Sequence, residues 1–164
     1  GRWIGRLAKP LGVRLTGVQR TPASRPDYFA ASDNLIAVDR LDEILPETDH
    51  LVIVLPSGAE TDRILDRRRI GLLPPRAMVY NLGRGNAIDE DALAEALQAG
   101  RLAGACLDVY QEEPLPAASP LRRCPNALLM PHASAISPDY LDLFVEEFVG
   151  RYREAFPAPR PEGA

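Results

Sequence analysis

The stretch that decides the fold is Tyr80–Glu90, which reads YNLGRGNAIDE. The apolar run at residues 77–80 is typical of a buried strand, and Asp89 precedes a regular apolar spacing that indicates a capped helix over residues 89–99. Arg84, which stands between two glycines, is therefore predicted to lie on a strand-to-helix turn. Ligands of open α/β sheets bind at such turns, where glycine lets a backbone or a ligand come close. A solvated loop arginine is the plainer alternative.

The rest of the chain alternates strands with helices in the same way. Strands are predicted at residues 14–18, 35–38, 50–55, 77–82, 104–109 and 127–130. Helices are predicted at residues 4–11, 41–45, 60–65 and 67–73, and a last amphipathic helix carries the apolar stripe Leu141, Phe144, Val145, Phe148, Val149 and Tyr152. Strands that are apolar throughout indicate a parallel sheet covered on both faces. The predicted fold class is α/β, a doubly wound parallel sheet of the Rossmann type.

The first five residues, Gly1-Arg2-Trp3-Ile4-Gly5, already form the turn into a helix, and no strand precedes them. A Rossmann sheet needs a central first strand, followed by a G-x-G-x-x-G loop that opens the helix. If Gly5 is the third glycine of that loop, Arg2 stands at the second. We therefore expect a fragment in which residues 1–156 form one α/β domain without its first strand and residues 157–164 are a disordered tail.

Composition excludes several classes of function. The chain has 164 residues, 46% of them hydrophobic, and a formal net charge of −4, so it lacks the basic surface that binds nucleic acid. No apolar run reaches the roughly 18 residues that span a bilayer. Cys106 and Cys124 have no C-x-x-C spacing, so neither a metal site nor a disulfide framework is indicated. We expect a soluble protein in the reducing cytoplasm.

Four segments, in this order, resemble one known family. They are Gly5–Ala8 at the start of a helix, Asn81–Gly85 after a strand, Leu107–Pro114 and Pro131–Ala133. Together they resemble the NAD(P)-binding domain of the D-isomer-specific 2-hydroxyacid dehydrogenases, and the resemblance extends over residues 4–153. Each motif alone is modest evidence, whereas the arginine, Glu-Pro and Pro-His elements at matching spacing are specific.

The resemblance implies that Arg84, Glu113 and His132 form the catalytic set. Reduction of a 2-keto acid needs a group that holds the carboxylate, and the planar guanidinium of arginine does so with two hydrogen bonds. A histidine can exchange the proton near neutral pH, and a carboxylate beside it orients the ring. The nicotinamide carries the hydride. Alternatives remain: His132 can be a plain loop histidine, and Glu113 a surface carboxylate with Glu112 as its rival.

The resemblance also places the cofactor along Ile4, Gly5, Leu55, Pro56, Thr61, Leu82, Gly83, Asp108, His132 and Ser134. Asp108 can instead cap the turn after its strand. An acidic residue at the end of the second Rossmann strand would bind the ribose hydroxyls of NAD, whereas an arginine accommodates the extra phosphate of NADP. The corresponding residues here are Gln19, Arg20 and Thr21. Arg20 therefore favours NADP over NAD.

Taken together, these features predict an NAD(P)-dependent oxidoreductase that acts on a small 2-keto or 2-hydroxy acid of the glyoxylate or hydroxypyruvate kind. The family also implies a homodimer and a second, substrate-binding domain. Because that domain is absent, we expect the isolated chain to bind cofactor poorly and to turn over almost nothing. A non-catalytic, nicotinamide-responsive corepressor of the same fold is the alternative. The Glu-Pro and Pro-His pair disfavours a Rossmann enzyme that acts on an amino acid or a nucleoside.

Overall fold

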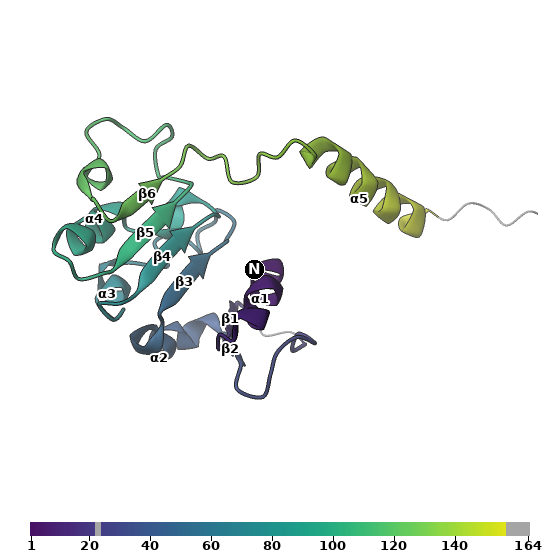
Figure 1. Ribbon diagram of the computed structural model, residues 1–164, viewed down its shortest axis with the longest axis horizontal. Helices are drawn as coiled ribbons and strands as arrows, with labels where there is room; N and C mark the ends of the chain where they lie inside the picture. The colour runs from purple at the N-terminus through teal and green to yellow at the C-terminus, as the bar shows by residue number, and fades with distance from the viewer. Residues whose placement is uncertain (22–23, 157–164) are drawn as a thin grey trace, which may run out of the picture. The chain divides into compact units, whose positions relative to one another are not determined.

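The computed structural model describes residues 1–21 and 24–156 (Figure 1). The chain divides into two compact units, Gly1–Pro131 and His132–Ala164. The predicted disordered tail, residues 157–164, lies outside the described residues. The first unit contains all of the strands that the structure describes, and the second contains the last helix.

The N-terminal part of the first unit is a short helix and a two-stranded sheet. α1 (Arg2–Ala8) runs into a single 3-10 turn, η1 (Lys9–Leu11), and ends at Gly12, whose φ of 79° is left-handed. Glycine adopts this conformation without steric penalty, so the predicted end of the helix is confirmed. β1 (Thr16–Gln19) then pairs in parallel with β2 (Asn34–Ala37).

Four parallel strands form the larger sheet, in the order β3-β4-β5-β6 (Figure 1). They are β3 (His50–Ile53), β4 (Met78–Asn81), β5 (Gly104–Leu107) and β6 (Ala127–Leu129). The helices and 3-10 turns of this part are η2 (Val38–Arg40), α2 (Leu41–Ile44), η3 (Leu45–Glu47), α3 (Arg67–Ile70), η4 (Gly85–Ala87), α4 (Glu90–Gln98) and η5 (Pro120–Arg123). The parallel α/β arrangement predicted from the sequence is confirmed, with most strands shorter than predicted.

The two-stranded sheet is not hydrogen-bonded to the four-stranded sheet. Among the strands that the structure describes, β1 pairs with β2 alone and β3 with β4 alone. In a doubly wound sheet a central strand joins the two halves at this position, which is the position of the strand predicted to be missing. The sheets are still connected through the hydrophobic core, against which Val18 packs, and through an ion pair of Arg14 with Glu47.

Helices α3 and α4 pack on one face of the four-stranded sheet. Ile70, Leu93 and Leu97 are buried there together with Val79 and Leu107 of the strands. Asp89 caps α4 by accepting a hydrogen bond from the Ala92 amide at 3.0 Å, as predicted. The opposite face carries a cross-strand row of Val52, Tyr80, Cys106 and Leu128, in which Leu128 is 61% exposed. The helices of this unit therefore cover the second face less completely than predicted.

The helix predicted at residues 60–65 is wrong. Arg63 has a φ of 45°, which a right-handed helix does not accommodate. The Thr61 hydroxyl donates to the carbonyls of Pro56 and Gly58 in a tight turn. Leu65 forms an isolated parallel β-bridge with Ile88 and is buried there in extended backbone, not on the face of a helix. The helix predicted at residues 67–73 is limited to the single turn of α3, which Asp66 caps.

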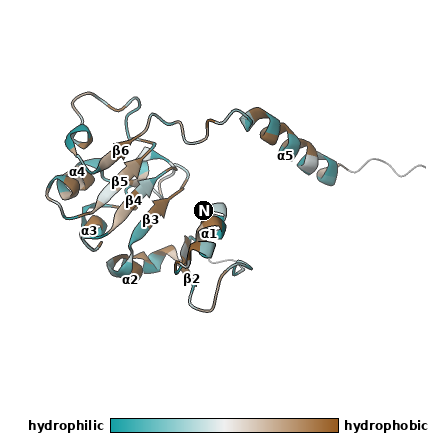
Figure 2. Ribbon diagram, viewed as in Figure 1, coloured by the Kyte–Doolittle hydropathy of each residue, from teal (hydrophilic) through white to brown (hydrophobic). Residues whose placement is uncertain are grey.

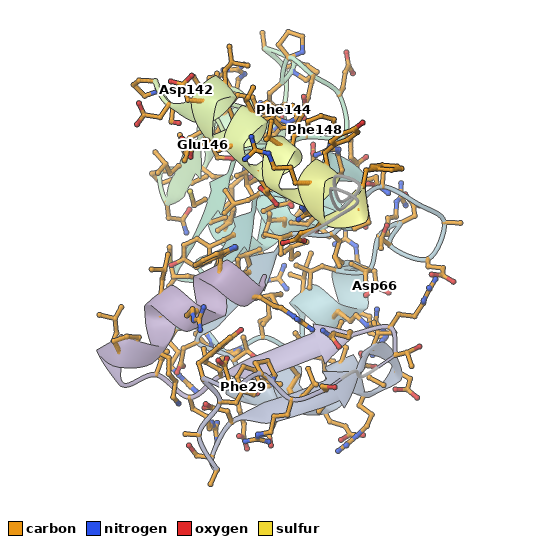
Figure 3. The ribbon with its side chains drawn as sticks, turned by 90° about the vertical axis from the view of Figure 1, so that its right-hand side faces the viewer. Phe29, Asp66, Asp142, Phe144, Glu146 and Phe148 are labelled. Carbon is orange, nitrogen blue, oxygen red and sulfur yellow. The ribbon has the colours of Figure 1, made fainter. Side chains whose placement is uncertain are left out.

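The second unit contains α5 (Tyr140–Ala155), which confirms the predicted long helix. Figure 3 shows Phe144 and Phe148 on one side of α5 and Asp142 and Glu146 on another. The Phe144 and Phe148 rings stack with centroids 6.3 Å apart, and Tyr152 continues the stack. The amphipathic pattern appears in Figure 2 as alternating brown and teal along this helix.

Candidate functional site

The turn after β4 is built by the buried side chain of Asn81. Its Oδ1 accepts a hydrogen bond from the Gly83 amide at 3.1 Å, and its Nδ2 donates to the Arg84 carbonyl at 3.0 Å. The Arg84 side chain is exposed and donates from Nη1 to the Gly83 carbonyl at 2.7 Å. Arg84 thus lies on a strand-to-helix turn, as predicted. The role of Asn81 was missed, although an Asn at the end of an apolar strand is a usual turn signal.

The two glycines beside Arg84 are needed for close packing. A Cβ on Gly83 would lie 2.6 Å from the backbone N and O of Leu55, and one on Gly85 would lie 1.8 Å from the carbonyl carbon of Tyr110. The turn is therefore pressed between the loops that follow β3 and β5. This explains why the arginine has glycine on both sides: neither neighbouring loop leaves room for a side chain.

The loop after β5 carries the predicted acid. Asp108 is 1% exposed, and its amide donates to the Asn81 carbonyl at 3.0 Å. Glu113 folds back on this loop and accepts a hydrogen bond from the Tyr110 amide at 3.0 Å. The peptide bond between Glu113 and Pro114 is cis. Glu112 and Glu113 are both exposed, and Glu113 is held to its own loop by this hydrogen bond.

A second pair of hydrogen bonds joins this loop to the segment after Arg84. Glu90 accepts from the Gln111 amide at 2.6 Å, and Gln111 Nε2 donates to the Ile88 carbonyl at 2.7 Å. Burial raises the pKa of Glu90, and the charges of Asp91 and Glu113 raise it further. The segments that carry Arg84 and Glu113 are therefore held together. The sequence did not indicate this, because an acidic residue in the first turn of a helix is ordinary.

The predicted cofactor residues of the first unit follow the carboxyl ends of the strands. The Thr61 hydroxyl lies 2.8 Å from the Pro56 carbonyl, which closes the loop after β3 beside Leu55. The Leu82 amide continues the ladder to the Ile53 carbonyl at 3.0 Å. The structure thus brings Leu55, Pro56, Thr61, Leu82, Gly83 and Asp108 to one edge of the larger sheet.

Helix α1 begins near the same edge. A Cβ on Gly1 would be 3.5 Å from Val54 Cγ2, just after β3. Ile4 and Gly5 both lie within α1, and a Cβ on Gly5 would be 3.1 Å from the Tyr28 hydroxyl oxygen. Close packing at Gly5 is what the third glycine of a dinucleotide-binding loop provides. Arg2, by contrast, stands where the G-x-G-x-x-G pattern has its second glycine.

Arg20 and Thr21 are exposed at the end of β1. Arg20 Nη1 forms an ion pair with Glu60 Oε2 at 2.9 Å, and both side chains are largely exposed. Since exposed ion pairs contribute little free energy, a phosphate can compete with Glu60 for the guanidinium. Thr21 directly precedes residues 22–23, which the structure does not describe.

His132 and Ser134 belong to the second unit. His132 has a φ of 56°, a left-handed conformation that is uncommon for residues other than glycine and often marks functional sites. Met130, two residues before His132, is held by the Tyr110 hydroxyl, which donates to the Met130 carbonyl at 2.8 Å. The same hydroxyl lies 3.0 Å from the Leu107 carbonyl. Burial raises the pKa of Tyr110. Sequence reasoning gave Tyr110 no role.

Within residues 1–21 and 24–156, no group of three or more His, Cys, Asp or Glu side chains could hold a metal ion. Cys106 and Cys124 are free thiols. None of the helices in the described part of the chain has the length and hydropathy needed to cross a membrane.

Parallel strands, flanking helices and a glycine-bounded turn at the carboxyl edge define a dinucleotide-binding α/β domain of the Rossmann type. Residues 1–134 match the family described as the D-isomer specific 2-hydroxyacid dehydrogenase, NAD binding domain. The chain belongs to this family.

Named relatives agree with this assignment. The chain is 47% identical over 92 residues to glyoxylate/hydroxypyruvate reductase B of Pectobacterium carotovorum, which covers 56% of this chain and 29% of that protein. It is 37% identical over 158 residues to glyoxylate/hydroxypyruvate reductase A of Klebsiella pneumoniae, which covers 96% of this chain and 49% of that protein. The chain therefore spans less than half the length of these relatives.

A solved structure of a third protein is similar throughout the described fold. It is the NADPH-dependent glyoxylate/hydroxypyruvate reductase of Sinorhizobium meliloti in complex with NADP and malonate. The TM-score is 0.78 at 28% identity, with 96% of this chain and 47% of that chain covered.

Proposed function

We propose that this chain is the nucleotide-binding part of an enzyme that transfers a hydride between NAD(P)H and a small 2-keto acid of the glyoxylate or hydroxypyruvate kind. The observation that carries the proposal is the contact of Gly85 with the Tyr110–Gln111 peptide, which holds the turn of Arg84 against the loop of Glu113. The names of the related reductases support the substrate class.

Each proposed catalytic residue has a chemical task. Arg84 forms no ion pair within the described residues and donates only to its neighbour's carbonyl, so its remaining N–H groups are available to a substrate carboxylate. His132 would give a proton to the keto oxygen, and Glu113 would orient its ring and favour its protonated form. The nicotinamide, when bound, supplies the hydride.

The residues at the carboxyl edge fit such a cofactor. Leu55 and Pro56 offer an apolar surface in the loop after β3, and Gly5 gives the close helix packing of a dinucleotide loop. We propose that Arg20, with Thr21, favours NADP by releasing Glu60 and binding the additional phosphate.

Parallel titrations of the chain with NADPH and NADH test the cofactor assignment, with reduced-nicotinamide emission as the signal. We expect weak binding of both dinucleotides, tighter for NADPH than for NADH, and we expect Arg20→Asp to remove the difference. Equal affinities in the unchanged chain would overturn the NADP preference. Binding of neither dinucleotide would overturn the proposed function itself.

Oxidation of NADPH in the presence of glyoxylate or hydroxypyruvate tests the reaction. We expect at most a trace of turnover by this chain, and none in Arg84→Ala. Arg76→Ala is the matched control, because Arg76 pairs with Asp49 and precedes β4 at its amino end. An equal effect of both variants would refute the role of Arg84. Assembly as a homodimer and a location in the cytoplasm stay predictions.

A further inference from the structure

The apolar stripe of α5 lacks a partner element within its own unit. Over residues 132–156, the described part of that unit, α5 is the only helix and no strand is present. None of the 16 residues of α5 is buried. Side chains of the stripe are 54–69% exposed at Leu141, Phe144, Val145, Phe148 and Tyr152. A helix of this length is only marginally stable in water by itself, so its apolar face requires a partner.

The spacing of the stripe is that of two paired helices. Intervals of four, three and four residues separate Leu141, Val145, Phe148 and Tyr152. Two helices with this alternation bury a common line of side chains between them. Ring stacking runs along the same face, from Phe144 to Phe148 and on to Tyr152, with neighbouring centroids 6.3 Å apart. The face is therefore a continuous apolar surface that fits another helix of the same spacing.

The charges beside the stripe match those of a second, antiparallel copy. Asp142 and Glu146 lie together on one side of α5 (Figure 3), and the helical repeat places Arg153 on the same side, near the other end. Asp142 and Arg153 are eleven residues apart, about 16 Å along the axis, so they do not pair within one helix. In an antiparallel pair with a two-fold axis near Phe148, Asp142 of each helix faces Arg153 of the other. A parallel pair would instead bring the acidic first halves together.

The opposite side of the stripe carries a second matching pair of charges. Glu147 and Arg151 form an ion pair within one helix, with 2.5 Å between Arg151 Nη2 and Glu147 Oε1, and both side chains are largely exposed. Antiparallel docking brings Glu147 of each helix near Arg151 of the other, so that the two pairs join into a network of four charges. Exposed ion pairs contribute little affinity by themselves, but they determine orientation. The stripe therefore supplies the affinity, and the flanking charges set the direction.

We propose that a second copy of this chain docks on α5 through its own α5, in antiparallel orientation. The apolar stripe is buried between the two helices, and Asp142 of each copy contacts Arg153 of the partner subunit. The contact lies outside the α/β unit, and no residue assigned to substrate or cofactor belongs to α5. The proposal therefore stands independently of the proposed function.

Sedimentation velocity of the full chain, over a range of concentrations at low salt, tests the docking. We expect a reversible equilibrium between monomer and dimer. Phe148→Glu places a charge in the middle of the stripe and should leave only monomer, because burial of an unpaired charge is too costly. Leu128→Glu is the matched control: Leu128 is 61% exposed on β6, outside α5, so this variant should dimerise like the unchanged chain.

Charge reversal tests the orientation. Arg153→Asp and Asp142→Arg should each weaken the dimer about tenfold, since the two-fold axis turns each change into two like-charge contacts. The double variant, which exchanges the two charges, should recover most of the lost affinity. Because Asp142 and Arg153 do not touch within one helix, this recovery would come from contact between copies. Salt at about 1 M should reduce the weakening in the single variants.

The remaining outcomes overturn the proposal. A chain that stays monomeric at every concentration would show that something other than a second copy covers the stripe. A dimer that survives Phe148→Glu and is lost in Leu128→Glu would place the contact on the sheet. A double variant as weak as the single ones would refute the antiparallel pairing. None of these results depends on NADPH binding, so the proposed function is tested separately.

Discussion

Replacing Gly85 by alanine tests the contact on which the site depends. The new Cβ would lie 1.8 Å from the Tyr110 carbonyl carbon, 2.0 Å from its oxygen and 2.4 Å from the Gln111 amide nitrogen. Ordinary contact begins near 3.4 Å, so the two segments must separate by roughly 1.5 Å. That movement would stretch the bonds of Gln111 to Glu90 and Ile88. The φ of Gly85 is not positive, so the expected damage is steric and not conformational.

The expected loss of stability is about 2–4 kcal/mol. Overpacking typically costs about 1–3 kcal/mol, each weakened hydrogen bond adds about 1 kcal/mol, and the reduced freedom of the unfolded chain returns about 0.4–1 kcal/mol. In a chain of this length this loss lowers Tm by about 4–15 °C. Circular dichroism on heating measures it. Gly58→Ala is the control, because its Cβ would meet only Thr61 Oγ1, at 3.9 Å. Equal Tm values for Gly85→Ala and Gly58→Ala would refute the reasoning.

Three further predictions concern the framework around the site. The hydrogen bond from the Leu15 amide and the ion pair with Lys9 hold the pKa of Asp33 at about 2, below its ordinary value of 3.8. The charged form of Asp33 therefore stabilises the fold fully above pH 4, and this stabilisation is lost as the pH falls from about 4 to 2. The Tm difference between the unchanged chain and Asp33→Asn should shrink over that range. A Tm difference that stays constant would contradict this. Glu90→Gln keeps an acceptor for the Gln111 amide and should unfold at nearly the same denaturant concentration, whereas Glu90→Ala should lose about 1 kcal/mol. Tyr110→Phe should lose a similar amount, and an unchanged midpoint would show that its hydroxyl does not anchor Met130.

Local patterns predicted most of the fold. The caps at Asp89 and Gly12 and the apolar strands have causes within a few residues, and all are present. The stripe of α5 is also a short-range signal, repeated over several turns. The helix at residues 60–65 was wrong because Leu65 pairs with Ile88, which lies more than twenty residues away. Tertiary pairing of this kind overrides helical spacing.

The site shows the same division between local and distant causes. The glycines around Arg84 marked a turn, which is a local property, and the structure confirms it. The partner of each glycine was not predictable, because Leu55 and Tyr110 approach from other strands. Likewise, the sequence distinguished Glu113 from Glu112 only through the following proline, whereas the structure gives Glu113 a hydrogen bond to the loop.

The packing of the turn suits the role proposed for Arg84, which is to hold the carboxylate of a substrate. Arg84 itself has extended backbone, with a φ of −142°, so its position is not a product of a flexible glycine conformation. The Asn81 side chain holds the turn by hydrogen bonds to the backbone of Gly83 and Arg84. Gly83 packs against the backbone of Leu55, and Gly85 packs against the backbone of Tyr110. Flexible glycines would leave the backbone of Arg84 mobile, whereas the close packing of Gly83 and Gly85 restricts the movement of the turn. A guanidinium on a rigid turn loses less entropy on binding a carboxylate, which is what a positioning arginine requires.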